Sequence, residues 1–381
     1  MTKISATFLG FLIFMAMSCR EEYLLPVGSN DNFFLVVDGV IDPGTDTTTI
    51  KLTRTQDPGS FFFDILEEQA GVFVISRDQT EINIPYVGNG TYTRVGLSLN
   101  PNLEYKLSIH TVDGKRYESD FVPVNITPPI DSLTWKQDED VTIFVNTHDP
   151  TNKSHFYRWE FSELWEYHAP YESVWGIDYS AELIYRRDST NLLNKCWTSQ
   201  GSKDILLSTS KDLSEDRIAA FPLTIVKRGR DKMGVRYSVL AKQYALTEEG
   251  FEYWQLLRKN SKDLGSIFGV QPSTITGNIH CLNNPDEPVI GFVSIATATE
   301  KRLFIKNSEL QNWGFKWETD CEEVRITHDS VVAYLLKNRH YSPGYYVSEL
   351  PPTPKPPMAL LTTPCVDCRT RGGTTTKPSF W

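Results

Sequence analysis

Short runs of alternating hydrophobic and polar residues follow one another along the first third of the chain. In "EYKLSIHTV", Tyr105, Leu107 and Ile109 are separated by single polar residues. A period of two is the pattern of a half-buried β-strand. The Asn-Gly pair in "VGNGTY" and the Asp-Gly pair in "TVDGKRY" are strong signals for tight hairpin turns. Several short strands joined in this way predict an immunoglobulin-like β-sandwich over residues 33–126.

Prolines interrupt this pattern in "VPVNITPPIDSLTW". The adjacent Pro128 and Pro129 cannot continue a β-ladder, so we place a domain boundary near Thr127. Residues 127–381 contain further runs typical of strands, such as "VTIFVNT" and "VRYSVLAKQYAL". The predicted fold class is therefore mainly β, with an N-terminal immunoglobulin-like β-sandwich followed by a larger β-rich domain.

One substantial helix is expected in the second domain, at residues 248–262. Thr247 is a residue type favoured at the N-cap, and two glutamates follow it in the first turn. Phe251, Trp254 and Leu257 then recur at every third position, which is the spacing of one helix face.

The N-terminus has the three parts of a secretory signal peptide. Lys3 is followed by the uncharged run "ATFLGFLIFMAM" and then by Ser18 and Cys19. A basic start, an apolar segment of about 7–15 residues and small residues at its end are typical of such signals. A membrane-spanning helix needs roughly 18 or more apolar residues. We therefore predict a signal peptide over residues 1–18.

The end of this segment, "AMSC", resembles a bacterial lipobox, in which the cysteine is lipidated and becomes the new N-terminus. Leucine is commoner than Ala16 at its position, and ordinary cleavage that leaves Cys19 as a thiol is the alternative. Two or more acyl chains give stable anchoring, so we expect a lipid anchor at Cys19 and a tether over residues 19–32. The following "REE" resembles the export signal of surface lipoproteins of Bacteroidota, although a solvated tether would use the same charges.

Composition narrows the classes of partner. The chain of 381 residues is 40% hydrophobic and 12% aromatic, which is enough to build a sizeable core. Its net charge is −10 and it has no basic run. Contacts with phosphates require clustered lysine and arginine, so the charge pattern excludes nucleic acid as a partner.

Two of the remaining cysteines form a CxxC pair in the C-terminal "CVDCRTRGGTTTKPSFW". Such a pair fits half a zinc site, a redox pair or structural disulfides. An exported chain meets an oxidising compartment, where disulfides persist. A structural zinc site usually needs four closely paired ligands, and a redox CxxC normally begins a helix. We therefore expect disulfides among Cys196, Cys281, Cys321, Cys365 and Cys368. Because the number of these cysteines is odd, one thiol should be left over.

We expect Cys321 to pair with Cys365 or Cys368, which would tie the tail to the second domain. Cys196 is then expected to pair with Cys281. A local bridge between Cys365 and Cys368, or two free thiols there, are the alternatives.

No catalytic or cofactor motif is present. The sequence contains no G-x-S-x-G elbow, P-loop, dinucleotide-binding fingerprint or H-E-x-x-H. The seven histidines are scattered and lack the paired spacing of metal ligands. We expect no enzyme activity, no cofactor and no metal. Separated carboxylates can still form a glycosidase pair in space, which keeps a surface polymer hydrolase as a third class of function.

Aromatic residues are most concentrated between residues 156 and 179. Alternation places Tyr157, Trp159 and Phe161 on one face of a strand, which is most simply the core. Beyond Phe161 the alternation loosens. Aromatic rings with polar edges suit protein interfaces and ligand stacking, while the alternative is that these rings also fill the core. The candidate contact residues are Trp165, Tyr167, Tyr171 and Trp175.

Several stretches resemble one family. "HFYRWEFSELWEYHAPY", "KCWTS", "VRYSVLAKQYALTEEGFEYWQ" and the C-terminal "CVDCRTRGGTTTKPSFW" are similar to the Bacteroidota lipoproteins grouped as domain of unknown function 4249. Such proteins are commonly encoded beside TonB-dependent outer-membrane receptors. The resemblance therefore implies a surface-exposed, lipid-anchored accessory protein of such a receptor in nutrient uptake. A structural or adhesive surface lipoprotein is the alternative.

Overall fold

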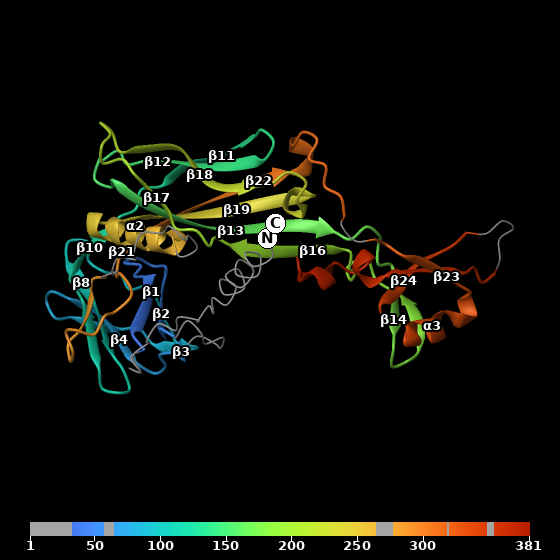
Figure 1. Ribbon diagram of the computed structural model, residues 1–381, viewed down its shortest axis with the longest axis horizontal. Helices are drawn as coiled ribbons and strands as arrows, with labels where there is room; N and C mark the ends of the chain where they lie inside the picture. Colours follow the sequence, from blue (N-terminus) through green and yellow to red (C-terminus); the bar gives the residue numbers. More distant parts are fainter. Residues whose placement is uncertain (1–32, 57–64, 264–276, 318–319, 349–353) are drawn as a thin grey trace, which may run out of the picture.

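The computed structural model describes residues 33–56, 65–263, 277–317, 320–348 and 354–381. The predicted signal peptide, Cys19 and the tether lie outside the described residues. The described chain is mainly β, as the alternation predicts. Figure 1 shows an elongated molecule, with an N-terminal sandwich at one end, a central sandwich above and beside it, and a small lobe at the opposite end.

The N-terminal sandwich consists of two sheets. The strands of the first sheet are β1 (Leu35–Val40), β2 (Thr47–Arg54), β3 (Ile65–Leu66), β6 (Tyr86–Gly88) and β7 (Thr91–Val95). The strands of the second sheet are β4 (Gly71–Ser76), β5 (Glu81–Asn83), β8 (Glu104–His110), β9 (Arg116–Ser119), β10 (Val122–Asn125), β20 (Ile279–Cys281) and β21 (Ile295–Ala296). The alternating residues of both sheets meet in one buried core, to which Leu52, Val72 and Leu107 belong.

The N-terminal sandwich is completed by a segment from much later in the chain. β20 pairs antiparallel with β9, and β21 pairs parallel with β10. Ile279, Val293 and Ile295 pack into the same core as the earlier strands. The predicted range 33–126 therefore omits residues 277–296, because two very short strands that pair with distant partners carry no local pattern.

The central sandwich also consists of two sheets. The strands of its first sheet are β11 (Ile130–Gln137), β12 (Val141–His148) and β18 (Arg217–Val226). The strands of its second sheet are β13 (Phe156–His168), β16 (Lys195–Gly201), β17 (Leu206–Thr209), β19 (Arg236–Ala245) and β22 (Ala298–Lys306). Val145, Trp159 and Val239 lie in the core between them. Tyr157 and Trp159 face inward as predicted, with Arg158 on the opposite, outer face of the second sheet.

The predicted helix is α2 (Glu248–Asp263). Its N-cap is Thr247, whose Oγ1 accepts a hydrogen bond from the backbone N–H of Gly250 at 3.1 Å. Phe251 is buried against Leu207 and Tyr244. In Figure 1, α2 lies between the two sandwiches.

The lobe has a small core of its own, which contains Leu335, Met358 and Leu360. Its elements are β14 (Trp175–Asp178), β15 (Leu183–Arg186), β23 (Glu323–Ile326), α3 (Val331–Lys337), β24 (Tyr341–Tyr346) and β25 (Met358–Thr362). β14 and β15 form a hairpin, and β25 lies between β23 and β24. Short 3₁₀ turns occur at Asp231–Met233, Asn307–Glu309, His328–Ser330, Thr363–Cys365 and Cys368–Arg371.

Candidate functional site

Two of the four predicted contact aromatics are core residues. Trp165 is 8% exposed and Tyr167 is 2% exposed, and both belong to the core of the central sandwich. They lie on β13, which keeps its alternation over thirteen residues, so that its odd-numbered positions stay inward. The prediction that Trp165 and Tyr167 form a contact surface is therefore wrong.

The other two predicted aromatics, Tyr171 and Trp175, are half-buried and belong to the lobe region. The ring of Tyr171 stacks on that of Tyr345 with centroids 6.2 Å apart. Trp175 meets Tyr346 edge to face at 4.9 Å. The structure thus divides the predicted residues among the core of the central sandwich and two smaller hydrophobic clusters instead of bringing them together on one surface.

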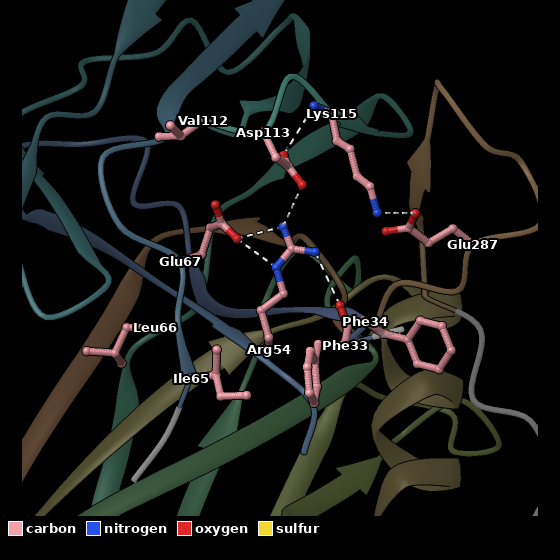
Figure 2. A pocket seen from close by; sticks show the side chains of 10 residues that line it. All are labelled: Phe33, Phe34, Arg54, Ile65, Leu66, Glu67, Val112, Asp113, Lys115 and Glu287. Carbon is pink, nitrogen blue, oxygen red and sulfur yellow. Dashed lines mark hydrogen bonds and ion pairs between the residues drawn. The ribbon is translucent and has the colours of Figure 1, made fainter. Parts of the chain in front are cut away.

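A cavity of about 540 Å³ opens at the N-terminal sandwich, beside the first described residue (Figure 2). The apolar residues that line it include Phe33, Ile65 and Val112. The charged residues that line it are all joined in ion pairs: Arg54 contacts Glu67 at 2.6 Å and also lies 3.9 Å from Asp113, and Lys115 contacts Glu287 at 2.8 Å.

Glu287 is the centre of the network beside this cavity. It accepts hydrogen bonds from Lys115 and, at 2.6 Å, from the hydroxyl of Tyr117. Although burial alone would raise the pKa of Glu287, these two donors hold it below its ordinary value. Burial, with the carboxylate as acceptor, raises the pKa of Tyr117. The contacts of Glu287 with Lys115 and Tyr117 join two segments that are distant in sequence, and they leave none of these charges unpaired for a ligand.

A second concave region, which we call the groove, lies between the two sandwiches. It consists of two adjoining cavities of about 520 and 500 Å³. The residues that line both cavities are Asp38 of β1, Arg158 and Glu160 of β13, Lys242 of β19 and Glu300 of β22.

The floor of the groove is the outer face of the second sheet of the central sandwich. Glu160, Lys242 and Glu300 lie directly opposite one another on three neighbouring strands. Lys242 forms an ion pair with Glu300 at 3.4 Å. The alternation that turns Tyr157 and Trp159 into the core necessarily turns their neighbours Arg158 and Glu160 toward the groove.

Arg158 is the most buried of the charged residues that line both cavities of the groove, with 8% of its surface exposed. Its Nη2 contacts Glu160 at 2.8 Å. Its guanidinium lies over the ring of Trp254 at 4.2 Å and near that of Tyr244 at 5.1 Å. The alternation that predicts Tyr157 and Trp159 as core leaves Arg158 on the opposite face of the strand, where a charged residue usually indicates a solvated surface, so the sequence pattern does not single it out.

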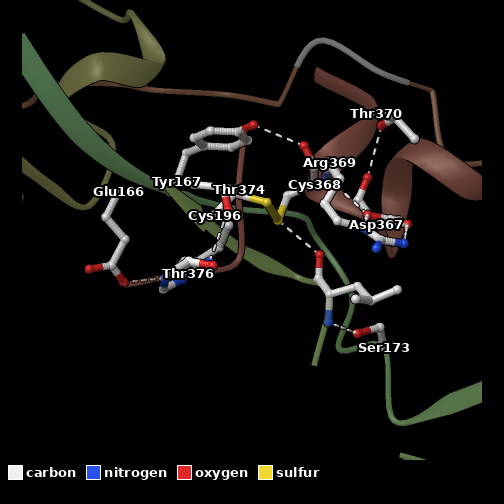
Figure 3. The surroundings of a disulfide bond; sticks show 12 residues. Glu166, Tyr167, Ser173, Cys196, Asp367, Cys368, Arg369, Thr370, Thr374 and Thr376 are labelled. Carbon is white, nitrogen blue, oxygen red and sulfur yellow. Dashed lines mark hydrogen bonds and ion pairs between the residues drawn. A yellow bond between two sulfur atoms is a disulfide. The ribbon is translucent and has the colours of Figure 1, made fainter. Parts of the chain in front are cut away.

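The disulfides correct one expected pairing and agree with another. Cys321 pairs with Cys365, one of the two expected partners. Cys196 pairs with Cys368 and not with Cys281 (Figure 3). Cys281 is buried and forms no disulfide with any described residue. The expected pairing of Cys196 with Cys281 was wrong because Cys281 lies on β20, in the other sandwich.

The Cys196–Cys368 disulfide fastens the C-terminal tail, residues 367–381, to β16. Beside it, Tyr167 donates a hydrogen bond to the carbonyl oxygen of Cys368 at 2.9 Å (Figure 3). Trp197 and Thr374 exchange two backbone hydrogen bonds, at 2.8 and 2.9 Å. At the end of the tail, Trp381 donates to Glu166 at 2.9 Å. The tail therefore covers part of the same outer sheet face whose other end forms the floor of the groove.

Among the described residues, two kinds of feature are absent, a metal-binding cluster and a membrane-spanning helix. No group of three or more His, Cys, Asp or Glu side chains in the described ranges lies in a position to hold a metal ion. None of the helices in the described part of the chain combines the length and apolar character needed to cross a membrane.

Comparison with known families gives one match. The family described as Domain of unknown function (DUF4249) matches residues 20–302. This range spans the N-terminal sandwich, nearly all of the central sandwich and the β14–β15 hairpin, and it ends before β23. No curated protein matches the chain.

Proposed function

This chain belongs to the family described as domain of unknown function DUF4249, and on that premise we propose that it is an outer-membrane lipoprotein that assists a TonB-dependent receptor in nutrient uptake. Cys19 is the proposed lipid anchor, and the cell surface is the proposed location. The lipobox-like "AMSC" supports the anchor. The lipoproteins that the sequence resembles, which are commonly encoded beside such receptors, support the partner. In this proposal the protein binds its receptor and catalyses no reaction.

The observation that carries the proposal is an exposed surface of the lobe, which we call the contact face. Tyr179, Leu183 and Tyr185 are all more than one-third exposed there, and Leu183 is 45% exposed. Tyrosine and arginine are enriched at the centres of protein interfaces. The contact face consists of Tyr179, Leu183, Tyr185, Arg187 and Arg339.

The two arginines of the contact face are held against its tyrosines. The guanidinium of Arg339 lies 4.9 Å from the ring centre of Tyr179. Nη1 of Arg187 donates to the hydroxyl of Tyr185 at 3.1 Å. Gly176, opposite Tyr185 on the hairpin, makes this packing feasible: a Cβ there would lie 2.7 Å from the Tyr185 ring and 2.9 Å from Arg187.

Charge favours a partner with carboxylates at this surface. Neither Arg187 nor Arg339 forms an ion pair with a carboxylate of the described residues, in a chain whose net charge is −10. Arginines that are preorganised and lack an internal partner can pair with acidic side chains of another protein at little entropic cost. We therefore propose that the contact face binds an acidic surface of the receptor.

The position of the lobe agrees with this role. Phe33, the first described residue, lies beside the N-terminal sandwich, and the lobe lies at the other end of the long axis (Figure 1). An anchor at Cys19 would thus hold the molecule by one end and leave the contact face free at the other.

Affinity purification from detergent-solubilised membranes tests the proposal. The wild-type protein should recover a large β-barrel receptor. Leu183→Asp should lose most of that recovery, because the new carboxylate would repel the acidic groups of the receptor that the contact face is proposed to bind. The matched control is Leu213→Asp, which changes a leucine that is 56% exposed on the central sandwich. Both variants should melt within a few degrees of the wild type, since surface substitutions rarely cost more than about 0.5 kcal/mol.

Two outcomes oppose the proposal in different ways. Equal recovery by both leucine variants places the contact on another surface. Recovery of no receptor by the wild type, together with undiminished growth of a deletion strain on every nutrient tested, favours the structural or adhesive lipoprotein instead.

A further inference from the structure

The groove between the sandwiches has the position and size of a small-molecule site. Ligand sites occur preferentially where domains meet, in cavities of about 300–1,000 Å³. Both cavities of the groove fall in this range. A third cavity of about 370 Å³ continues from them past Asp38 and Trp254, toward Leu257 and Phe292. The groove is therefore long enough for an extended ligand.

Charges of both signs line the groove, and four of the five residues that line both of its cavities are paired with one another. Arg158 contacts Glu160, and Lys242 contacts Glu300 while lying opposite Glu160. An anionic ligand would meet six carboxylates, those of Asp38, Asp42, Asp46, Glu160, Asp204 and Glu300. A cationic ligand would meet Arg158, Lys203 and Lys242. To bind at Arg158, Glu160, Lys242 or Glu300, either would have to break an ion pair to gain a new one, which would leave a charge without its partner.

A neutral hydroxyl group has no such difficulty, because it donates one hydrogen bond and accepts others. It can donate to the carboxylates of Glu160 or Glu300 and accept from Arg158 or Lys242 without separating either pair. Vicinal hydroxyls can do both at once. The paired charges therefore match a polyhydroxylated neutral ligand better than an ion.

Arg158 supplies an independent observation. Its guanidinium lines both cavities, yet among the described residues its only ion pair or hydrogen bond is through Nη2 to Glu160. Its buried Nε has no hydrogen-bond partner. A guanidinium carries five N–H donors, and buried donors are normally satisfied. The unused donors of this side chain, which is 8% exposed, indicate that an acceptor from outside the chain completes the site.

Trp254 adds an apolar surface to these polar groups. It is half-buried on α2 and lines both the polar part of the groove and its apolar continuation. The guanidinium of Arg158, 4.2 Å from its ring centre, holds the indole in place. An aromatic ring beside hydrogen-bonding side chains can stack on the C–H face of a sugar ring while those side chains bind its hydroxyls.

We propose that the groove binds a neutral oligosaccharide. The ligand stacks one sugar ring on Trp254 and directs hydroxyls at Arg158, Glu160, Lys242 and Glu300. This site is separate from the contact face of the lobe and does not depend on the proposed receptor.

The test uses the purified protein without its proposed lipid anchor, residues 20–381, on an array of neutral and acidic glycans, followed by calorimetric titration with the best neutral oligosaccharide. At least one neutral glycan should bind, and uronic-acid polymers should not. Glu300→Gln keeps the shape of an exposed side chain and should weaken binding about tenfold. The matched control, Glu215→Gln on an exposed loop, should bind as the wild type does. Arg158→Gln should weaken binding further, and the melting temperature of each variant is measured alongside.

Binding of no neutral glycan on the array overturns the proposal, as does exclusive binding of acidic glycans. Unchanged titration curves for Glu300→Gln, in a protein that still binds a glycan, also overturn it, because the ligand then lies elsewhere. If Arg158→Gln fails to fold, Glu300→Gln alone decides. None of these outcomes bears on recovery of the receptor through the lobe.

Discussion

At the scale of single residues, Asp149 shows how a surface turn is held by one carboxylate. Asp149 follows β12 and accepts hydrogen bonds from the backbone N–H groups of Thr151, Lys153 and Ser154 at 2.8, 3.1 and 3.0 Å. Burial opposes its ionisation, but these donors outweigh it and lower the pKa of Asp149 to about 2. The ionised carboxylate therefore stabilises the folded state.

Asp149→Asn should consequently destabilise the protein in a pH-dependent way. A pKa that is lower in the folded than in the unfolded chain gives stability that is present above about pH 4 and is lost as the pH falls toward 2. Since one pKa unit corresponds to about 1.4 kcal/mol and nearby solvent screens part of the shift, we expect a loss of about 1–2 kcal/mol at pH 7. Urea denaturation at pH 7, 4 and 3 measures it, with Asp138→Asn as an exposed control. A difference from wild type that stays constant as the pH falls contradicts this account.

Single residues also explain why the aromatic cluster was misjudged. Along β13, Glu163 occupies an inward position and is 3% exposed, while Leu164 points outward. The strand itself keeps its inward–outward alternation, but this exchange interrupts the hydrophobic–polar pattern of the sequence that would have marked Trp165 and Tyr167 as core. Glu163 is tolerated inside because Lys232 pairs with it at 2.5 Å and Tyr237 donates to it at 2.7 Å. Those partners lie about seventy residues away, so the local pattern could not reveal them.

At the scale of elements, the Cys196–Cys368 disulfide fixes a tail that has little regular structure of its own. It joins residues 172 positions apart, and cross-links over long loops stabilise chiefly by restricting the unfolded chain. Trp381 and Phe304 meet edge to face at 5.7 Å, and the guanidinium of Arg302 lies 3.8 Å from the ring centre of Phe380. The disulfide thus holds the tail where these contacts can form.

Replacing both cysteines by serine should free the tail. We expect a loss of about 2–5 kcal/mol in the free energy of unfolding, which is the usual effect of removing a native disulfide. Limited trypsin digestion should then cut after Arg369 or Arg371 well before the core strands are cut. The Cys321→Ser/Cys365→Ser variant is the control, because it loosens the lobe and leaves the tail attached. A tail that stays equally protected without its disulfide would show that the aromatic and cation–π contacts suffice.

Elements differ in how far the sequence predicts them. The bounds of α2 were predicted to within a residue, because its N-cap residue and the hydrophobic residues at every third position are local signals in the sequence. Strands such as β8 were predicted for the same reason. The return of residues 277–296 to the N-terminal sandwich was not predicted, nor was the pairing of Thr374 with Trp197. Both depend on contacts between distant segments, and the groove depends on them too, since Asp38 and Arg158 come from different sandwiches.

At the scale of the whole molecule, the described parts lie along one axis, and their order suits a protein held at one end. Residues 33–56 begin the N-terminal sandwich, while the contact face lies on the lobe at the far end (Figure 1). Cys19 is separated from Phe33 by a short segment, which at about 3.3–3.6 Å per residue spans at most roughly 50 Å. A lipid at Cys19 would therefore keep the N-terminal sandwich close to the membrane and present the groove and the lobe away from it.

Cys19→Ala should release the protein from the membrane, because the acyl chains supply the whole of the proposed anchoring. After cell fractionation, the variant is expected in the soluble fraction and the wild type in the outer-membrane fraction. Cys281→Ala, which changes a buried cysteine of the N-terminal sandwich, should stay with the membrane. On intact cells, added trypsin should cut the wild type at the exposed Lys337 or Arg339 of the lobe. A Cys19→Ala variant that remains bound refutes the anchor. A wild-type lobe that trypsin cuts only after lysis refutes the outward orientation, and with it the assignment of the contact face to a partner at the cell surface.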